Sequence, residues 1–297
     1  MKLGKVQKTI LKITVSVVLF GFLLYKLHTK DLLKSLLLLD IRYIPLIVLL
    51  LVLNYIVSSI RWKNLLSIYE NTDHVSVWYL TSLYFIGSFF NNFMPTSIGG
   101  DVFKVYKLGA KIKNNAHGFS STFMERFTGI IALVLISSIS LIKLLGILGV
   151  VLFVGFWVAA LIGFLSLKLL STKVKMLEKL YSSLMQYKGK TKVLTIAFLS
   201  SFIVQFLAIF TQYFIFVALG IKLPFFYSMF VFPVITLASF FIPSLNGVGV
   251  QDTLYVQMLK TVAVAPALAL SASIIYHLSR LAVSLVGGLL YAAGKAD

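Results

Sequence analysis

The sequence contains no cysteine, which excludes disulfide bonds, thiolate metal sites and cysteine nucleophiles. It has only four histidines, and neither an HExxH motif nor a comparable ligand spacing occurs. A P-loop and a dinucleotide-binding glycine fingerprint are also missing. We therefore expect no metal and no cofactor, and we find no catalytic constellation that would make the chain an enzyme.

Charge is scarce as well. Only 12% of the residues are charged, against about 25% in ordinary soluble domains, and 59% are hydrophobic. Several stretches lack Asp, Glu, Lys and Arg for longer than the roughly 20 residues that a bilayer-spanning helix needs. They include Leu144–Leu167, Val193–Ile221 and Leu223–Gln251. These features predict an all-α polytopic membrane protein that forms a single integral membrane domain over residues 1–297.

The net charge of +18 indicates membrane orientation rather than a nucleic-acid partner. With the N-terminus inside, 18 Lys and Arg side chains fall on the cytoplasmic side and 7 on the outer side, as the positive-inside rule requires. We thus predict a multi-pass protein of the plasma (inner) membrane with both termini cytoplasmic. The predicted spanning helices are Thr9–Leu27, Tyr43–Ile60, Phe119–Ile142, Leu144–Lys168, Val193–Leu219 and Ala265–Gly294.

Several basic residues are assigned to the membrane surface. Arg61, Trp62 and Lys63 follow the second predicted helix and suit the headgroup layer. Lys104 and the other lysines of residues 101–113 are assigned to a solvated cytoplasmic segment. Residues 168–192 contain seven lysines and one glutamate, and we expect this basic loop to rest on anionic lipid.

Two hydrophobic runs, 148 residues apart, are broken in nearly the same way. In each, proline is followed by small and hydroxyl residues, two glycines and an aspartate. Paired interruptions of this kind indicate a transporter-like site near the middle of the membrane. We predict two re-entrant hairpins in two inverted repeats, residues 1–143 and 144–297, each with about three spanning helices; hydropathy alone gives 6–8 helices. The candidate residues of the breaks are Asn92, Pro95, Gly99, Gly100, Pro243, Gly247 and Gly249.

Five ionisable residues lie at the breaks or inside the apolar runs, namely Asp101, Glu125, Arg126, Asp252 and Arg280. Such residues are costly within a membrane and by default mark a functional site. The alternatives are helix-capping aspartates and a purely structural ion-pair network. We predict that Arg126 pairs with Asp101 or Asp252, and Arg280 with Glu125. The planar guanidinium of arginine suits phosphate, so Arg126 and Arg280 are candidate headgroup ligands.

The motifs together resemble a known family. The first half supplies residues 91–95, Gly99-Gly100-Asp101, Ala116, Glu125-Arg126 and Gly129, and the second supplies Pro243, residues 247–249, Asp252 and Gly287-Gly288. They resemble the transmembrane domain of lysylphosphatidylglycerol synthases, a flippase-like family with stand-alone members. The resemblance implies a lipid-handling domain that moves a headgroup between leaflets, with the five ionisable residues along its polar path.

The chain departs from that pattern at two places. Lys104 stands where similar sequences usually have arginine, and Gln251-Asp252 stands where an Arg-Glu pair is common. Lysine is a point charge, whereas the planar guanidinium of arginine can form two parallel hydrogen bonds. We therefore expect the choice of headgroup to differ from that of similar sequences. The chain stops at Asp297, so we expect no soluble synthase domain and no aminoacylation by this chain.

The predicted function is therefore translocation of a phospholipid or a lipid-linked anionic substrate between leaflets. The alternative is a membrane enzyme, or an accessory subunit of a glycosyltransferase or lipid-modifying enzyme, acting on a lipid-phosphate carrier. Membrane lipid and such a partner enzyme are the expected partners.

Overall fold

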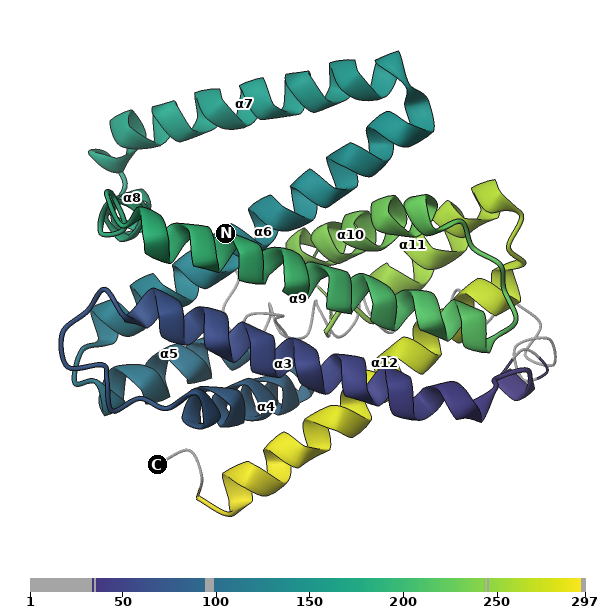
Figure 1. The fold of residues 1–297 in the computed structure, drawn as a ribbon, viewed down its shortest axis with the longest axis horizontal. Helices are drawn as coiled ribbons and strands as arrows, with labels where there is room; N and C mark the ends of the chain where they lie inside the picture. Colours follow the sequence, from purple (N-terminus) through teal and green to yellow (C-terminus); the bar gives the residue numbers. More distant parts are fainter. Residues whose placement is uncertain (1–33, 35, 94–98, 243, 245, 295–297) are drawn as a thin grey trace, which may run out of the picture.

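The computed structural model describes residues 34, 36–93, 99–242, 244 and 246–294, and this part of the chain consists of helices and their connections, without strands (Figure 1). The predicted helix Thr9–Leu27 and the prolines Pro95 and Pro243 lie outside the described residues. Two short 3-10 turns, η1 (Ile41–Tyr43) and η2 (Lys260–Val262), precede α3 and follow α11. The α-helices are α3 (Ile44–Leu66), α4 (Val77–Phe93), α5 (Gly99–Lys111), α6 (Asn115–Leu145), α7 (Ile147–Ser171), α8 (Lys175–Met185), α9 (Thr191–Ala218), α10 (Phe225–Phe241), α11 (Val250–Leu259) and α12 (Pro266–Ala292).

Five of these helices are long and apolar enough to cross a membrane: α3, α6, α7, α9 and α12. They coincide with the five predicted spans that fall within the described residues, which confirms the prediction of an all-α polytopic membrane fold. The predicted bounds of α3 and α6 were too short. α3 continues six residues beyond Ile60, and α6 starts at Asn115, because the Asn114 side chain accepts hydrogen bonds from the amides of Ala116 and His117.

The same order of elements occurs twice, as a long helix, two short helices and a second long helix. In the first set these are α3, α4, α5 and α6, and in the second α9, α10, α11 and α12. α3 and α9 run side by side in opposite directions (Figure 1). The amide of Asp40, just before α3, donates to the carbonyl of Ala218 at the end of α9 (2.8 Å), and Asn64 near the end of α3 donates to Val193 near the start of α9 (2.8 Å).

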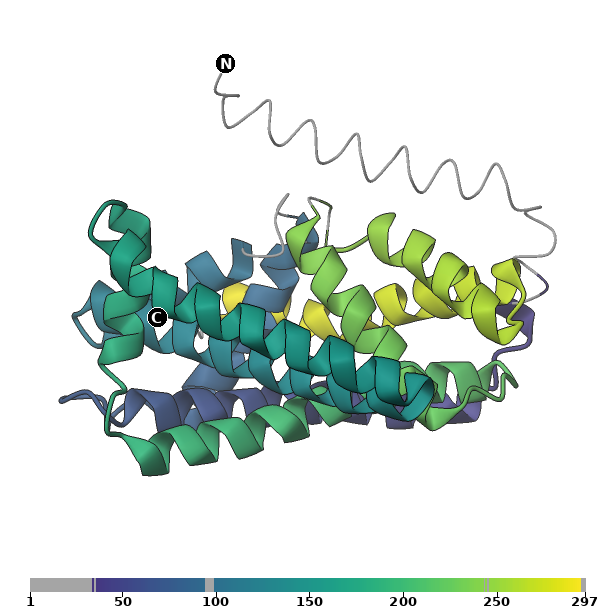
Figure 2. The same cartoon turned by 90° about the horizontal axis from the view of Figure 1, so that it is seen from above.

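One short helix of each set packs against the opposite set, and the other packs within its own set. α4 packs on α12, and α10 packs on α6. Figure 2 shows α3 and α9 along one face of the molecule and α10 and α11 toward the opposite face. The two interrupted segments are therefore held by contacts between the sets as well as within them.

α7 lies apart from this bundle and packs mainly against α6 and α8 (Figure 1). Only 6% of its apolar 18-residue stretch is buried. A Cβ added at Gly155 or Gly163 would meet no atom within 4 Å. A helix that is apolar on all sides needs an apolar environment on all sides. Lipid supplies that environment to a membrane-spanning helix, so the exposed faces of α7 are suited to contact acyl chains.

Candidate functional site

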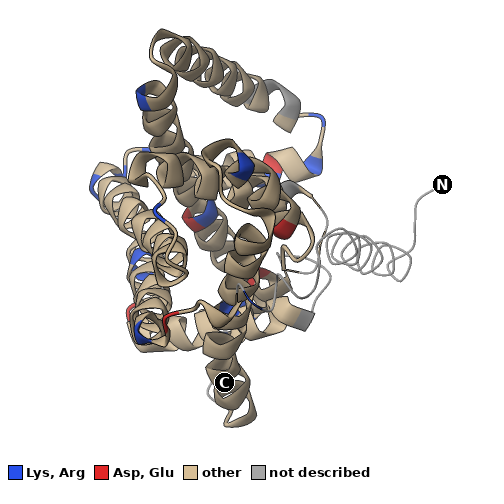
Figure 3. Cartoon of the chain, turned by 90° about the vertical axis from the view of Figure 1, so that its right-hand side faces the viewer, with Lys and Arg blue, Asp and Glu red and all other residues tan. Residues whose placement is uncertain are grey.

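A cavity of about 340 Å³ lies between the two sets of helices. Helices α3, α4, α5 and α6 of the first set line it, together with α9, α10, α11 and α12 of the second. Its volume falls in the range of small-molecule sites, about 300–1,000 Å³. Figure 3 shows basic and acidic positions among the packed helices as well as in the connections. The ionised side chains that line the cavity are Arg61, Asp101, Lys104, Glu125, Arg126 and Arg280.

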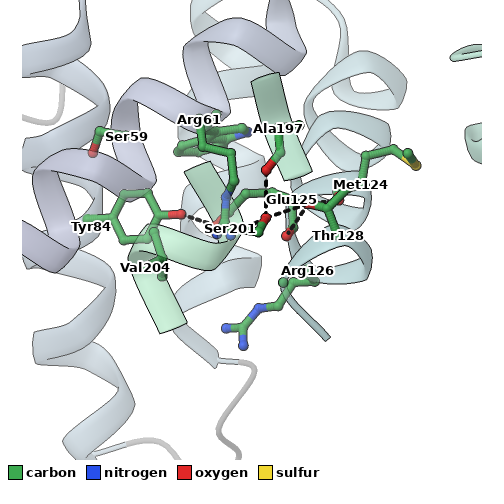
Figure 4. A network of polar contacts seen from close by, with 12 residues as sticks. Ser59, Arg61, Tyr84, Met124, Glu125, Arg126, Thr128, Ala197, Ser201 and Val204 are labelled. Carbon is green, nitrogen blue, oxygen red and sulfur yellow. Dashed lines mark hydrogen bonds and ion pairs between the residues drawn. The ribbon is translucent and has the colours of Figure 1, made fainter. Parts of the chain in front are cut away.

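Glu125 on α6 is the centre of the charge network (Figure 4). Its carboxylate forms an ion pair with the guanidinium of Arg61 on α3 and accepts a hydrogen bond from the hydroxyl of Tyr84 on α4. Lys104 Nζ lies 3.5 Å from the second carboxylate oxygen. Arg61 also donates to Ser201 Oγ on α9 (2.9 Å), so the network joins the two sets of helices.

Asp101 forms the second acidic position of the network. Its carboxylate pairs with Arg126, which confirms one of the predicted pairings, and with Lys104 at 3.1 Å. Lys104 Nζ also lies 3.9 Å from the centre of the Tyr84 ring. Arg126 points away from Glu125 (Figure 4), as expected for neighbouring residues on a helix, whose directions differ by about 100°. Its side chain is 38% exposed, whereas that of Lys104 is 5% exposed.

The end of α4 contacts the second break beside the cavity. Asn246, in the second break, donates from Nδ2 to Oδ1 of Asn92 at the end of α4 (2.7 Å). Arg280 on α12 donates to Oδ1 of Asn246 (2.6 Å), and Asn92 donates to Ser284 Oγ (2.7 Å). This chain of hydrogen bonds fixes the end of α4, the second break and α12 relative to one another.

The predicted pairing of Arg280 with Glu125 is wrong. Both side chains line the same cavity, but Glu125 is already neutralised by Arg61 and Lys104. Within the described part of the chain, Arg280 has no carboxylate at ion-pair distance, and its partner is the neutral amide of Asn246.

Asp252 takes the capping role that was the alternative for it. Its Oδ2 accepts the amide hydrogen bond of Gly249 at the start of α11 (2.7 Å), and His277 Nε2 lies 3.3 Å from its Oδ1. The carboxylate is fully buried, and Asp252 does not line the cavity. Gly249 (φ 82°) and Gly247 (φ 90°) adopt the left-handed backbone region that favours glycine, which explains their place before α11.

Gly99 and Gly100 are the first residues of α5 and are buried. The amide of Gly100 donates to Asn91 Oδ1 (2.7 Å), and a Cβ added to Gly100 would lie 2.1 Å from the carbonyl oxygen of Gly87 on α4. The glycine therefore lets α5 return directly against α4, and this return places Asp101 in the cavity wall.

Arg61 and Lys104 belong to the buried charge network, although the sequence had not indicated a role for Arg61 and had indicated a solvated position for Lys104. Both were assigned to surface positions, but each is only 4% exposed, and Trp62, assigned to the headgroup layer, is fully buried and donates to Ser121 Oγ. α3 continues past these residues and packs on α6. Two signals were available: Leu65 and Leu66 continue the apolar helix after Arg61, and Lys104 stands at the i+3 position from Asp101.

Comparison with curated proteins and with solved structures finds no match to this chain. The sequence profile of the family described as "Lysylphosphatidylglycerol synthase TM region" matches residues 9–288, which include both breaks and all six ionised residues of the cavity. This match confirms the resemblance that the motifs indicated. The chain is a multi-pass membrane protein and belongs to the lysylphosphatidylglycerol synthase TM-region family, which is linked to lipid-related membrane function.

Proposed function

We propose that the protein moves a lipid with an anionic headgroup between the two leaflets, with the headgroup passing through the cavity. The observation that supports this proposal is the set of ionised side chains, contributed by both sets of helices, around one cavity inside an apolar bundle. Ionisable residues inside a membrane are expensive and mark pathways for polar substrates. The acyl chains remain in the surrounding bilayer.

Arg126 and Arg280 are the proposed headgroup ligands. They come from the last long helix of each set and both line the cavity. Both arginines are half-buried as whole residues and line the cavity, so they have access to a bound headgroup. A guanidinium binds phosphate through two parallel hydrogen bonds, which gives direction as well as strength.

The proposed route uses the two interrupted segments as hairpins that enter from opposite faces of the membrane. The antiparallel course of α3 and α9 supports opposite orientations of the two halves. Transporters built from inverted halves expose a fixed central site alternately to each side by moving one half against the other. The contact between Asn92 and Asn246 lies where such a movement separates the breaks.

The arrangement of the carboxylates favours translocation over lipid-modifying catalysis. A general base needs a carboxylate free to take a proton from the substrate. Asp101 and Glu125 are both engaged by cations, and their side chains are 11% and 5% exposed. They are better placed to hold the cationic ligands than to transfer protons.

Purified protein in vesicles with fluorescent lipids in both leaflets tests the proposal. A membrane-impermeant quencher reports the lipid that reaches the outer leaflet. The wild-type protein is expected to accelerate transfer, and Arg126→Gln to slow it by at least about tenfold, the equivalent of about 1.4 kcal/mol. Lys222→Gln, which removes an exposed charge between α9 and α10, is the control and is expected to retain transfer. Transfer no faster than in protein-free vesicles, over zwitterionic and anionic lipids alike, would refute the proposal.

A further inference from the structure

We propose that the group bound in this cavity carries two negative charges on phosphate, as a phosphomonoester or a diphosphate does. The inference rests on the proposed function, because it names the substrate class of the same site. It follows from the balance of charge around the cavity.

The lining has more positive than negative charge. Four cations, Arg61, Lys104, Arg126 and Arg280, face two carboxylates, Asp101 and Glu125, which leaves an excess of two positive charges among the described lining residues. The undescribed residues of the two breaks (94–98, 243 and 245) contain no ionisable side chain in the sequence, so they do not change this balance. Asp252 lies outside the lining and is engaged by Gly249 and His277.

The excess charge lies on the two accessible arginines. Glu125 is shared by Arg61 and Lys104, whose side chains are each 5% exposed. Asp101 is shared by Lys104 and Arg126, so Arg126 is only partly neutralised. Among the described residues, the Arg280 guanidinium donates to the neutral Asn246 amide and lies 5.3 Å from the centre of the Tyr276 ring, with no carboxylate at ion-pair distance.

A bound dianion completes this balance. Charges buried in an apolar surrounding are costly unless they are paired. A phosphodiester lipid brings one negative charge and leaves one of the two excess positive charges unbalanced. A zwitterionic headgroup has no net charge and leaves both of them unbalanced. A phosphomonoester carries about 1.5 to 2 negative charges at pH 7 and offers three acceptor oxygens. It can therefore engage both guanidinium groups at once.

Competitive binding to the purified full-length chain tests the inference without relying on transport. The probes are phosphatidic acid, phosphatidylglycerol and phosphatidylcholine with identical acyl chains, and bound lipid is quantified by native mass spectrometry at pH 8. Phosphatidic acid is expected to bind at least about tenfold more tightly than phosphatidylglycerol, because one additional charge pair at a few ångströms is worth at least that factor in a partly buried site. Inorganic pyrophosphate is a separate competitor. Displacement by pyrophosphate shows that the phosphate group suffices, and its failure to displace shows that the acyl chains contribute; both results are consistent with a dianion site.

Two variants reduce the excess by one charge in different ways. Asn246→Asp places a carboxylate at the atom that Arg280 contacts, and aspartate tolerates the left-handed backbone of this position (φ 48°). Arg280→Gln removes the cation itself. Each is expected to reduce the preference for phosphatidic acid over phosphatidylglycerol by about tenfold, whereas Lys222→Gln, outside the cavity, leaves it unchanged.

The outcomes separate this inference from the proposed function. Equal or tighter binding of phosphatidylglycerol or phosphatidylcholine, no binding of any probe, or an unchanged preference in both folded variants overturns the dianion assignment. Dianion-selective binding without transfer in vesicles refutes translocation and leaves the assignment standing. Lipid transfer without selective binding of the dianion overturns the dianion assignment and leaves translocation standing.

Discussion

At the scale of single residues, the site consists of buried charges that depend on one another. Glu125 neutralises parts of two cations that come from α3 and α5, and Asp101 neutralises parts of two that come from α5 and α6. Removing one partner of a buried ion pair leaves an uncompensated charge, which costs more than the pair contributes. The network is therefore expected to stabilise the fold as well as the site.

Replacing Glu125 by glutamine tests this dependence. The substitution keeps the size of the side chain but leaves Arg61 without its carboxylate and Lys104 with Asp101 alone. The expected loss is about 3–5 kcal/mol of unfolding free energy, measured as a lower thermal transition in detergent. Glu178→Gln, at an exposed position on α8, is the matched control and is expected to have little effect. Equal transition temperatures for the two variants would contradict the account.

The residues of the site were predictable to different degrees. The sequence narrowed the partner of Arg126 to two aspartates, Asp101 or Asp252, and the structure has Asp101 in that place. Arg61 was not predictable in the same way, because its role depends on α3 packing against α6 and α9. The prediction that Arg280 pairs with Glu125 was wrong for the same reason. The sequence does not show that Arg61 lies beside Glu125 and is already its partner.

At the scale of elements, the close approach of α4 and α5 brings Asp101 into the cavity wall. The contact leaves no room for a side chain at Gly100, where an added Cβ would lie 2.1 Å from the Gly87 carbonyl oxygen. Backbone atoms cannot move aside as the end of a flexible side chain can. The hairpin geometry therefore depends on this glycine.

The Gly100→Ala variant is expected to lose about 1–3 kcal/mol of stability, as overpacked sites do, and to separate α5 from α4. Gly155→Ala on α7 is the control, because a Cβ there meets nothing within 4 Å and alanine favours a helix. Thermal unfolding of the two purified variants compares them directly. A stable Gly100→Ala protein with unimpaired lipid transfer would show that the tight hairpin is dispensable.

Hydrophobic runs were sufficient to predict α3, α6, α7, α9 and α12, because a spanning helix needs about 20 apolar residues. They did not give the ends of α3 and α6, where polar residues continue the helix. At Arg61 the charge that seemed to end the helix is buried by α6 and α9. A hydropathy pattern contains no information on such contacts.

At the scale of the whole molecule, the predicted orientation places residues 168–192 in the cytoplasm and Lys222 outside, with α9 crossing between them. The absence of native cysteine makes single-cysteine labelling direct. In intact cells, a membrane-impermeant maleimide is expected to label Lys222→Cys and to leave Lys179→Cys unlabelled until the membrane is permeabilised. The opposite pattern would reverse the orientation, and equal labelling would show that α9 does not separate the two sites.

The proposed translocation requires that the two breaks border one path for the headgroup. A reducible cross-linker of short reach, applied to the Asn92→Cys/Asn246→Cys double variant, tests this most directly, because the two native side chains are hydrogen-bonded at 2.7 Å. A cross-linked Lys175→Cys/Lys179→Cys pair, at two exposed positions of α8, controls for modification alone.

Lipid transfer in vesicles is the measurement. Cross-linking positions 92 and 246 is expected to stop transfer, and reduction of the cross-link is expected to restore it. The variant with the α8 pair is expected to transfer lipid whether it is cross-linked or reduced. Transfer that continues at the same rate with the two breaks covalently joined would contradict the account.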